Sequence, residues 1–134
     1  MRYLLLTLWF GVLAAQAASG TWTGESVGGR VSVGQQILAS RPLSAAGPLF
    51  SSATITRLAW HIELLTPPPP GLQIKLCARS VCFPLAGLSG VKQISAPLSP
   101  DETFRFLYSV NSRGPLTPAL QVISNQLTVN YHTP

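Results

Sequence analysis

The sequence contains few of the side chains that carry out chemistry. Its 134 residues include two histidines, two cysteines and four carboxylates, and charged residues make up 10% of the chain. It has no glycine-rich phosphate loop, no residues with metal-ligand spacing and no Gly-x-Ser-x-Gly motif around a nucleophile. We therefore predict that the protein is not an enzyme and that it uses no metal or other cofactor.

Two pairs of polar residues remain as candidates for acid–base chemistry. His61 and Glu63 lie two apart on one face of a predicted strand, so they could touch, and a hydrolase could use such a pair with a serine. Asp101 and Glu102 are adjacent in a predicted turn and cannot easily flank a glycosidic bond from opposite sides. We interpret the first pair as an exposed polar face and His132, near the end of the sequence, as solvated.

The first 17 residues have the layout of a secretory signal peptide. Arg2 precedes an apolar run over residues 3–15, and residues 15–17 (Ala-Gln-Ala) form a small-x-small cleavage site. The run is short for a membrane span, although a short N-terminal anchor is the alternative. We expect cleavage, export to the periplasm, no stable membrane insertion afterwards, and a single domain over residues 18–134.

Basic residues outnumber acidic ones by 9 to 4, a formal net charge of +5. Removal of Arg2 with the signal peptide lowers the net charge to +4. The lysines and arginines do not form a cluster. This balance favours solubility or weak attraction to an acidic partner, and it argues against nucleic-acid binding.

The two cysteines lie in a stretch that predicts a disulfide-linked β-hairpin. Apolar and polar residues alternate before Cys77 and again after Cys82. Placing the cysteines opposite each other also brings Leu76 opposite Phe83 and gathers the apolar side chains on one face, and a slip by one residue destroys both results. In an oxidising compartment such cysteines are expected to be paired, whereas a zinc site would need more ligands. The hairpin should project Arg79 at its tip, with the disulfide on the outward face.

Short runs of alternating residues, separated by turn signals, recur along the rest of the chain. Strands are predicted over residues 21–27, 31–33, 57–65, 91–96, 103–110 and 119–131, with loops over residues 44–52 and 111–118. Gly28-Gly29 predicts a hairpin turn, and residues 67–70 predict a stiff proline connector. A parity change around residues 124–126 predicts a bulge or a strand that crosses between sheets. No sustained helical period occurs. We predict an all-β, single-domain antiparallel β-sandwich or small barrel of about seven to eight strands.

Two tryptophans could offer platforms for a ligand. Trp60 shares its parity with Leu58 and Ile62, which favours core packing over sugar stacking. Trp22 has small, polar neighbours and is expected to be freer. A periplasmic module that binds cell-wall glycan, with Trp22 in its site, is therefore the alternative function.

The later part of the sequence resembles the flagellar protein FlhE family. The resemblance is carried by Leu58-Ala59-Trp60, a proline-rich connector, Gly71-Leu72-x-x-x-Leu76-Cys77-x4-Cys82, Leu85-x-Gly87-x-Ser89-Gly90, and Pro118-Ala119-Leu120-x-Val122-x-Ser124-Asn125-Gln126-x-x-Val129-Asn130-Tyr131. It is specific from about Leu58 onward and loose between Trp22 and Ser52.

The resemblance implies a non-enzymatic accessory protein beside the flagellar type III export apparatus. Such proteins are associated with preventing proton leak through that apparatus and with correct flagellar assembly. Cys77 and Cys82 carry over as a structural disulfide, and the family supplies no catalytic residues. We expect export-apparatus or rod proteins as partners, with Lys75, Arg79 and Arg105 as predicted contact residues. An edge strand could also pair with a strand of the partner.

Overall fold

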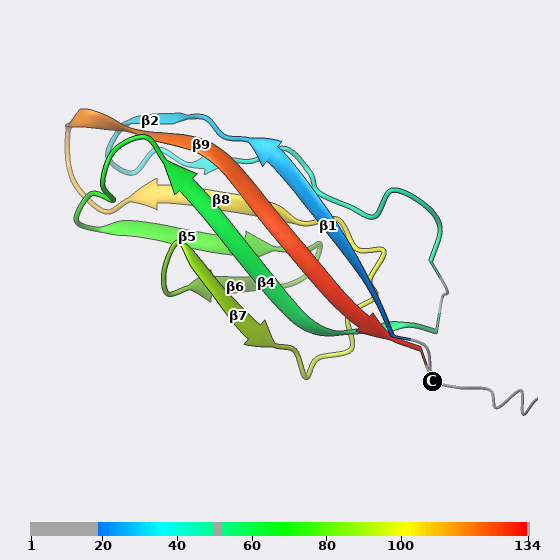
Figure 1. The fold of residues 1–134 in the computed structure, drawn as a ribbon. Helices are drawn as coiled ribbons and strands as arrows, with labels where there is room; N and C mark the ends of the chain where they lie inside the picture. The colour runs from blue at the N-terminus through cyan, green and yellow to red at the C-terminus, as the bar shows by residue number, and fades with distance from the viewer. Residues whose placement is uncertain (1–18, 50–51, 134) are drawn as a thin grey trace, which may run out of the picture.

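The protein folds into two antiparallel β-sheets packed face to face (Figure 1). The structure is a computed structural model that describes residues 19–49 and 52–133; the predicted signal peptide lies outside them. The strands are β1 (Ser19–Val27), β2 (Arg30–Val33), β3 (Leu38–Ala39), β4 (Thr54–Leu64), β5 (Leu72–Cys77), β6 (Cys82–Leu85), β7 (Ser89–Gln93), β8 (Arg105–Val110) and β9 (Pro115–His132). The all-β sandwich prediction is confirmed, with nine strands in the described part of the chain.

One sheet has the order β1-β9-β4-β7, with β2 also paired to β9, and the other has the order β3-β8-β5-β6. The facing sides of the two sheets form the core. On β8 the predicted alternation is confirmed, because Phe106, Tyr108 and Val110 are at most 1% exposed. Leu58 and Ile62 of β4 and Leu127 of β9 are buried on the opposing sheet. No helix of a length and hydropathy that could cross a membrane occurs among the described residues.

The long strand β9 connects most of the first sheet. Its C-terminal part pairs with β1, its N-terminal part with β2, and its other edge with β4. Opposite Glu63 and Leu64 of β4, the register passes from Ser124 to Val122 and leaves Ile123 out. This bulge confirms the parity change predicted from the sequence. The predicted loop over residues 111–118 is shorter than expected, because β9 already begins at Pro115.

Gly28 and Gly29 do not form the predicted hairpin turn. β1 and β2 both run along β9 instead of pairing with each other. The Gly28 N–H donates to Ile123 O, and the Val122 N–H donates to Gly29 O. A Cβ atom on Gly28 would lie only 2.1 Å from the Val122 carbonyl oxygen, so the close approach to β9 requires glycine there. The glycines let one strand continue into the next along the same neighbour.

The cysteine hairpin has the predicted register. Cys77 pairs with Cys82, Leu76 with Phe83 and Ile74 with Leu85, and the two cysteines form a disulfide. Leu76 is fully buried, whereas Cys82 is exposed. The disulfide therefore lies on the outward face and constrains the hairpin without filling the core.

Replacing both cysteines by serine is expected to lower the free energy of unfolding by about 2 kcal/mol, because the closed loop is short and little chain entropy is removed from the unfolded state. Urea denaturation of the oxidised wild type and the double variant measures the difference. The wild type under reducing conditions should match the double variant. A loss near zero would show that the unfolded chain is not restrained by this bond.

Candidate functional site

The outer side of the β3-β8-β5-β6 sheet carries exposed basic residues around the disulfide. The register places Lys75 opposite Leu107 and Cys77 opposite Arg105, so Lys75 and Arg105 are diagonal neighbours on one face. Both side chains are exposed. We call this surface the disulfide face; its residues are Gln73, Lys75, Cys77, Cys82, Pro84, Arg105, Leu107 and Ser109. None of the acidic residues in the described ranges belongs to the strands of this sheet.

The third predicted contact residue, Arg79, lies at the tip of the hairpin. Its backbone N–H donates to Glu102 Oε1 at 3.1 Å, which ties the tip to the loop before β8. Arg79 is therefore held beside a carboxylate, whereas Lys75 and Arg105 lie on strands without one. The structure brings two of the three residues onto one face and puts the third at its end. Their role in binding stays a prediction.

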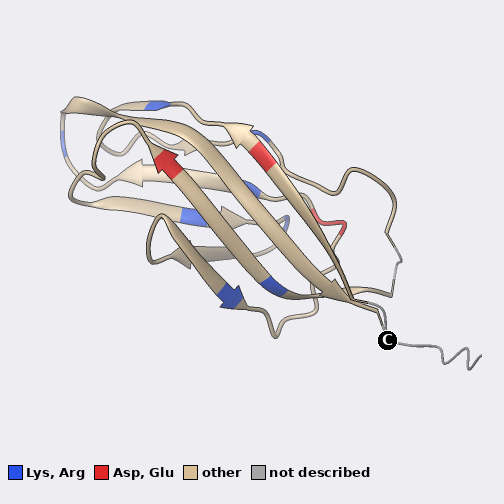
Figure 2. Ribbon diagram, viewed as in Figure 1, with Lys and Arg blue, Asp and Glu red and all other residues tan. Residues whose placement is uncertain are grey.

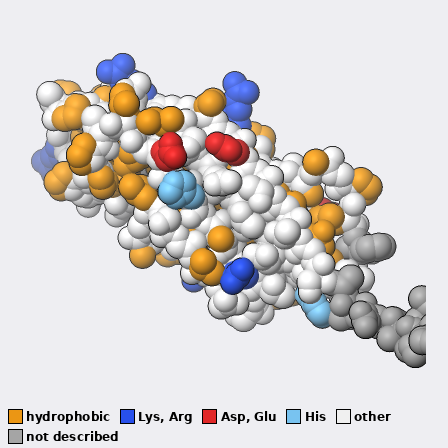
Figure 3. All heavy atoms as spheres, viewed as in Figure 1, with side chains coloured by type: hydrophobic (Ala, Val, Ile, Leu, Met, Phe, Trp, Pro, Cys, Tyr) orange, Lys and Arg blue, Asp and Glu red, His pale blue; other side chains and the backbone are white. Residues whose placement is uncertain are grey.

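The outer side of the other sheet carries charges of both signs, because Arg57 shares the outward face of β4 with Glu63. Glu25 of β1 and Glu63 of β4 lie near each other on it (Figures 2 and 3). His61 Nε2 lies 3.7 Å from Glu63 Oε1, so the predicted contact forms, and both side chains are 57% exposed. A solvated pair of this kind contributes little to stability. The hollow that His61 lines is open and has a volume of only about 120 Å³, smaller than the clefts that usually hold a substrate.

The prediction that Trp22 is free was wrong. Trp22 is only 9% exposed, its ring centroid lies 6.3 Å from that of Phe104, and its Nε1–H donates to Pro100 O at 2.8 Å. The small neighbours of Trp22 in the sequence do not surround it in space, because Pro100 and Phe104 in the segment before β8 supply its contacts. Trp60 is partly buried against the core and donates to Gly87 O, as the packing interpretation requires. Trp22 therefore offers no surface for stacking a sugar.

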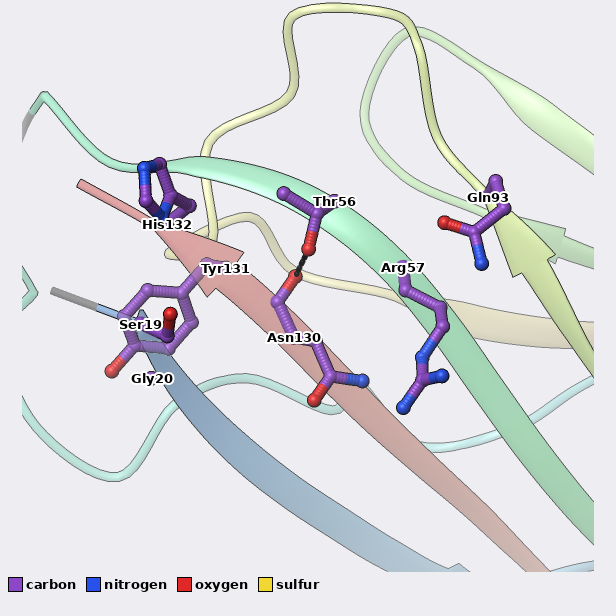
Figure 4. Close-up of a pocket in the computed structure, with 8 residues that line it drawn as sticks. All are labelled: Ser19, Gly20, Thr56, Arg57, Gln93, Asn130, Tyr131 and His132. Atoms are coloured by element: carbon purple, nitrogen blue, oxygen red, sulfur yellow. Dashed lines mark hydrogen bonds between the residues drawn. The ribbon is translucent and has the colours of Figure 1, made fainter. Parts of the chain in front are cut away.

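A shallow cavity of about 380 Å³ lies where the two ends of the described chain meet (Figure 4). The side chains of Asn130 and Arg57, which pair across β9 and β4, lie next to each other in it. Thr56 Oγ1 donates to Asn130 O, and His132 at the rim is exposed, as predicted. Nδ2 of Asn130 is buried without a hydrogen-bond partner. The described residues that line the cavity include N–H donors and no carboxylate, so these residues suit a small anionic group better than a cation.

A larger cavity of about 560 Å³ lies at the opposite end of the sandwich. Its walls are residues 66–70, the predicted proline connector, and residues 115–118 at the start of β9. The connector was predicted, but its partner wall was not, because the alternation in residues 115–118 is interrupted by prolines. Two exposed apolar side chains lie near this end of the molecule. One is Leu65, whose N–H donates to Gln121 O of β9, and the other is Ile123, which is left out of the register at the bulge.

The sequence did not reveal a polar contact inside the core. Asn125 is fully buried; its Oδ1 accepts a hydrogen bond from the Tyr108 hydroxyl, and its Nδ2 donates to Ser26 Oγ at 3.2 Å. Burial raises the pKa of the Tyr108 phenol far above its usual range. The parity change at Asn125 was the only signal in the sequence, and it indicated backbone geometry, not burial. These residues stabilise the fold. No group of three or more potential metal ligands occurs among the described residues.

Three comparisons with known proteins all indicate the same protein family. A family model described as "Flagellar protein FlhE" matches residues 28–132. The chain is 37% identical to flagellar protein FlhE of Escherichia coli K12 over 131 residues, covering 98% of this chain and 99% of that protein. It is 34% identical to FlhE of Yersinia enterocolitica, covering 97% and 94% respectively. A crystal structure of FlhE superposes with a TM-score of 0.80 at 39% identity, covering 86% of this chain and 98% of that one.

Proposed function

The chain belongs to the FlhE family of flagellar proteins, and from this membership we propose that it is a non-enzymatic periplasmic accessory protein of the flagellum. In this role it regulates or seals the flagellar type III export apparatus against proton leak, and it assists assembly by binding export or rod components. The observation that carries the proposal is the match to flagellar relatives over nearly the whole chain. The signal-peptide pattern in residues 1–17 supports the periplasmic location.

The disulfide face supports a binding role over a catalytic one. Lys75 and Arg105 are presented on a rigid sheet, and the adjoining hairpin is restrained by the disulfide, so little conformational entropy is lost on docking. Their charge attracts an acidic patch on a partner and raises the rate of encounter. This geometry suits a protein that docks on an assembly.

Deleting the gene is expected to impair motility and flagellar export and to lower cytoplasmic pH when the external medium is acidic, because protons enter through an unsealed export apparatus. Swimming assays, measurement of exported flagellar proteins and a cytoplasmic pH indicator test the three effects. Expression of the wild-type chain in the deletion strain should restore all of them. Wild-type behaviour of the deletion strain in all three assays would contradict the proposal.

Reversing two charges on the disulfide face, with Lys75→Glu and Arg105→Glu together, is expected to reduce this restoration. Both side chains are exposed, so the fold should tolerate the change. Arg30→Glu is the control, since it reverses an exposed charge on the other sheet. Equal restoration by both variants, at equal periplasmic protein levels, would show that the disulfide face does not contact the partner.

A further inference from the structure

The free edge of β1 is the longest unprotected sheet edge among the described strands. β1 has nine residues and pairs with β9 on one side only, in unbroken register from Ser19 to Val27. It contains no proline, lysine or arginine. Edges of this kind leave a row of unsatisfied N–H and C=O groups that can pair with a further strand.

The other described edges are short or obstructed. β3 has two residues, and β6 has four, one of them Pro84. β7 has five residues and carries Lys92, whose ammonium lies 5.7 Å from the centre of the Phe83 ring. Prolines, lysines and short strands are the usual means of protecting sheet edges. β1 has none of them.

The hydrogen-bonding pattern shows which groups of β1 face outward. The Gly28 N–H donates to Ile123 O at the end of the β1–β9 pair. Residue pairs in antiparallel strands alternate between hydrogen-bonded and non-hydrogen-bonded positions. Along this register, the main-chain N–H and C=O groups of the even-numbered residues of β1 therefore face β9. Those of Thr21, Thr23 and Glu25 face the free edge. The Thr23 and Thr128 hydroxyls approach to 3.2 Å, as expected for a non-bonded pair, where side chains are closer.

We propose that the free edge of β1 binds an extended segment of another protein as an additional strand of the β1-β9-β4-β7 sheet. The edge is rigid, because Trp22 anchors β1 in the core and the β9 register is continuous. On the inner side, Trp22 and Leu43 fill the space beside Gly24, since their nearest atoms lie 3.2 and 3.3 Å from where a Cβ of Gly24 would be. The bound segment places a lysine or arginine beside Glu25, which is exposed on the outer side of β1. Because Leu43 already covers the inner side of β1 at Gly24, the edge favours a single added strand over a second packed sheet. This inference does not depend on the flagellar role.

The test uses the secreted chain and a synthetic nine-residue peptide in which valine and threonine alternate, with one central lysine. Calorimetry measures its affinity, and hydrogen exchange locates it. We expect slowed exchange at the amides of Thr21, Thr23 and Glu25. Methylating alternate peptide nitrogens of the probe should weaken binding by about tenfold or more, because main-chain hydrogen bonds are lost.

Two variants separate the backbone from the side chain. Thr23→Pro removes the outward N–H, whereas Thr23→Ala keeps it, so only the proline variant should lose about tenfold in affinity. If Thr23→Pro fails to fold, Glu25→Lys serves instead, and it should reverse the preference between the lysine peptide and the same peptide with glutamate. Equal binding of the methylated probe, exchange protection at β6 or β7, no binding at millimolar concentration, or a dimer formed through β1 would each overturn the proposal. Unaltered motility and proton retention in strains carrying these variants would bear only on the flagellar role.

Discussion

Replacing Trp22 by alanine is expected to lower the free energy of unfolding by about 3–5 kcal/mol, the range for removing a large buried aromatic side chain. The indole packs against Phe104 between the two sheets and also satisfies the carbonyl of Pro100. Alanine would leave a cavity and an unpaired buried acceptor together. The loss should be large enough to leave much of a marginally stable domain unfolded at 37 °C.

Urea denaturation monitored by circular dichroism measures this loss. Trp22→Phe keeps a ring against Phe104 but removes the N–H donor, so we expect it to cost about 1–2 kcal/mol. Trp60→Ala is the matched control, because Trp60 also donates to a carbonyl but is only partly buried, and its loss should be smaller. A Trp22→Ala protein as stable as the wild type would contradict the core assignment. For the same reason, loss of any ligand binding in this variant would report unfolding and not a missing contact.

The elements that sequence reasoning predicted well are those whose pairing is local. In the cysteine hairpin, alternation on both sides of a short loop leaves one register that buries Leu76 and Phe83 together, and that register is observed. The alternation of β8 likewise identified its buried face. In both cases the information needed to orient the strand lies within the strand or its immediate neighbour.

The errors arose where the partner is distant in sequence. Gly28-Gly29 has the composition of a turn, but β9, about 90 residues later by register, offers β1 and β2 one continuous edge. The glycines are needed for close approach to Val122, a requirement that local propensity does not contain. Trp22 was misjudged for a similar reason, since its small sequence neighbours are unrelated to Phe104 and Pro100 that surround it. Periodicity reports which side of a strand is apolar, and it does not report which strand lies opposite.

The candidate site was predictable only in part. Alternation placed Lys75 on the outward side of its strand, and the structure adds that Arg105 lies diagonally across from it. The grouping of acidic residues on the outer side of the other sheet could not be predicted, because it depends on the strand order. Without that order, Glu25 and Glu63 are isolated carboxylates in the sequence. In the fold they share the side of the sandwich that faces away from Lys75.

Replacing Asn125 by alanine is expected to lower the free energy of unfolding by about 2–4 kcal/mol. The change removes a fully buried side chain and leaves the Tyr108 hydroxyl without its acceptor in the core. Gln126→Ala is the control, because it changes the adjacent, partly exposed polar residue of β9 and should cost no more than about 0.5 kcal/mol.

A double-mutant cycle with Tyr108→Phe tests whether the two side chains act together. Tyr108→Phe alone should cost about 1–2 kcal/mol, because Asn125 then loses a donor. Once Asn125 is absent, the same change removes an unsatisfied hydroxyl, so it should cost little or even stabilise the protein. The two losses should therefore fall short of additivity by about 1 kcal/mol or more.

Burial raises the pKa of the Tyr108 phenol, so the folded state keeps a proton that the unfolded state releases above its ordinary pKa of about 10. Stability should consequently fall as the pH rises beyond that value, and this decrease should disappear in Tyr108→Phe. Additive losses with an unchanged pH dependence would contradict a coupled contact between Tyr108 and Asn125.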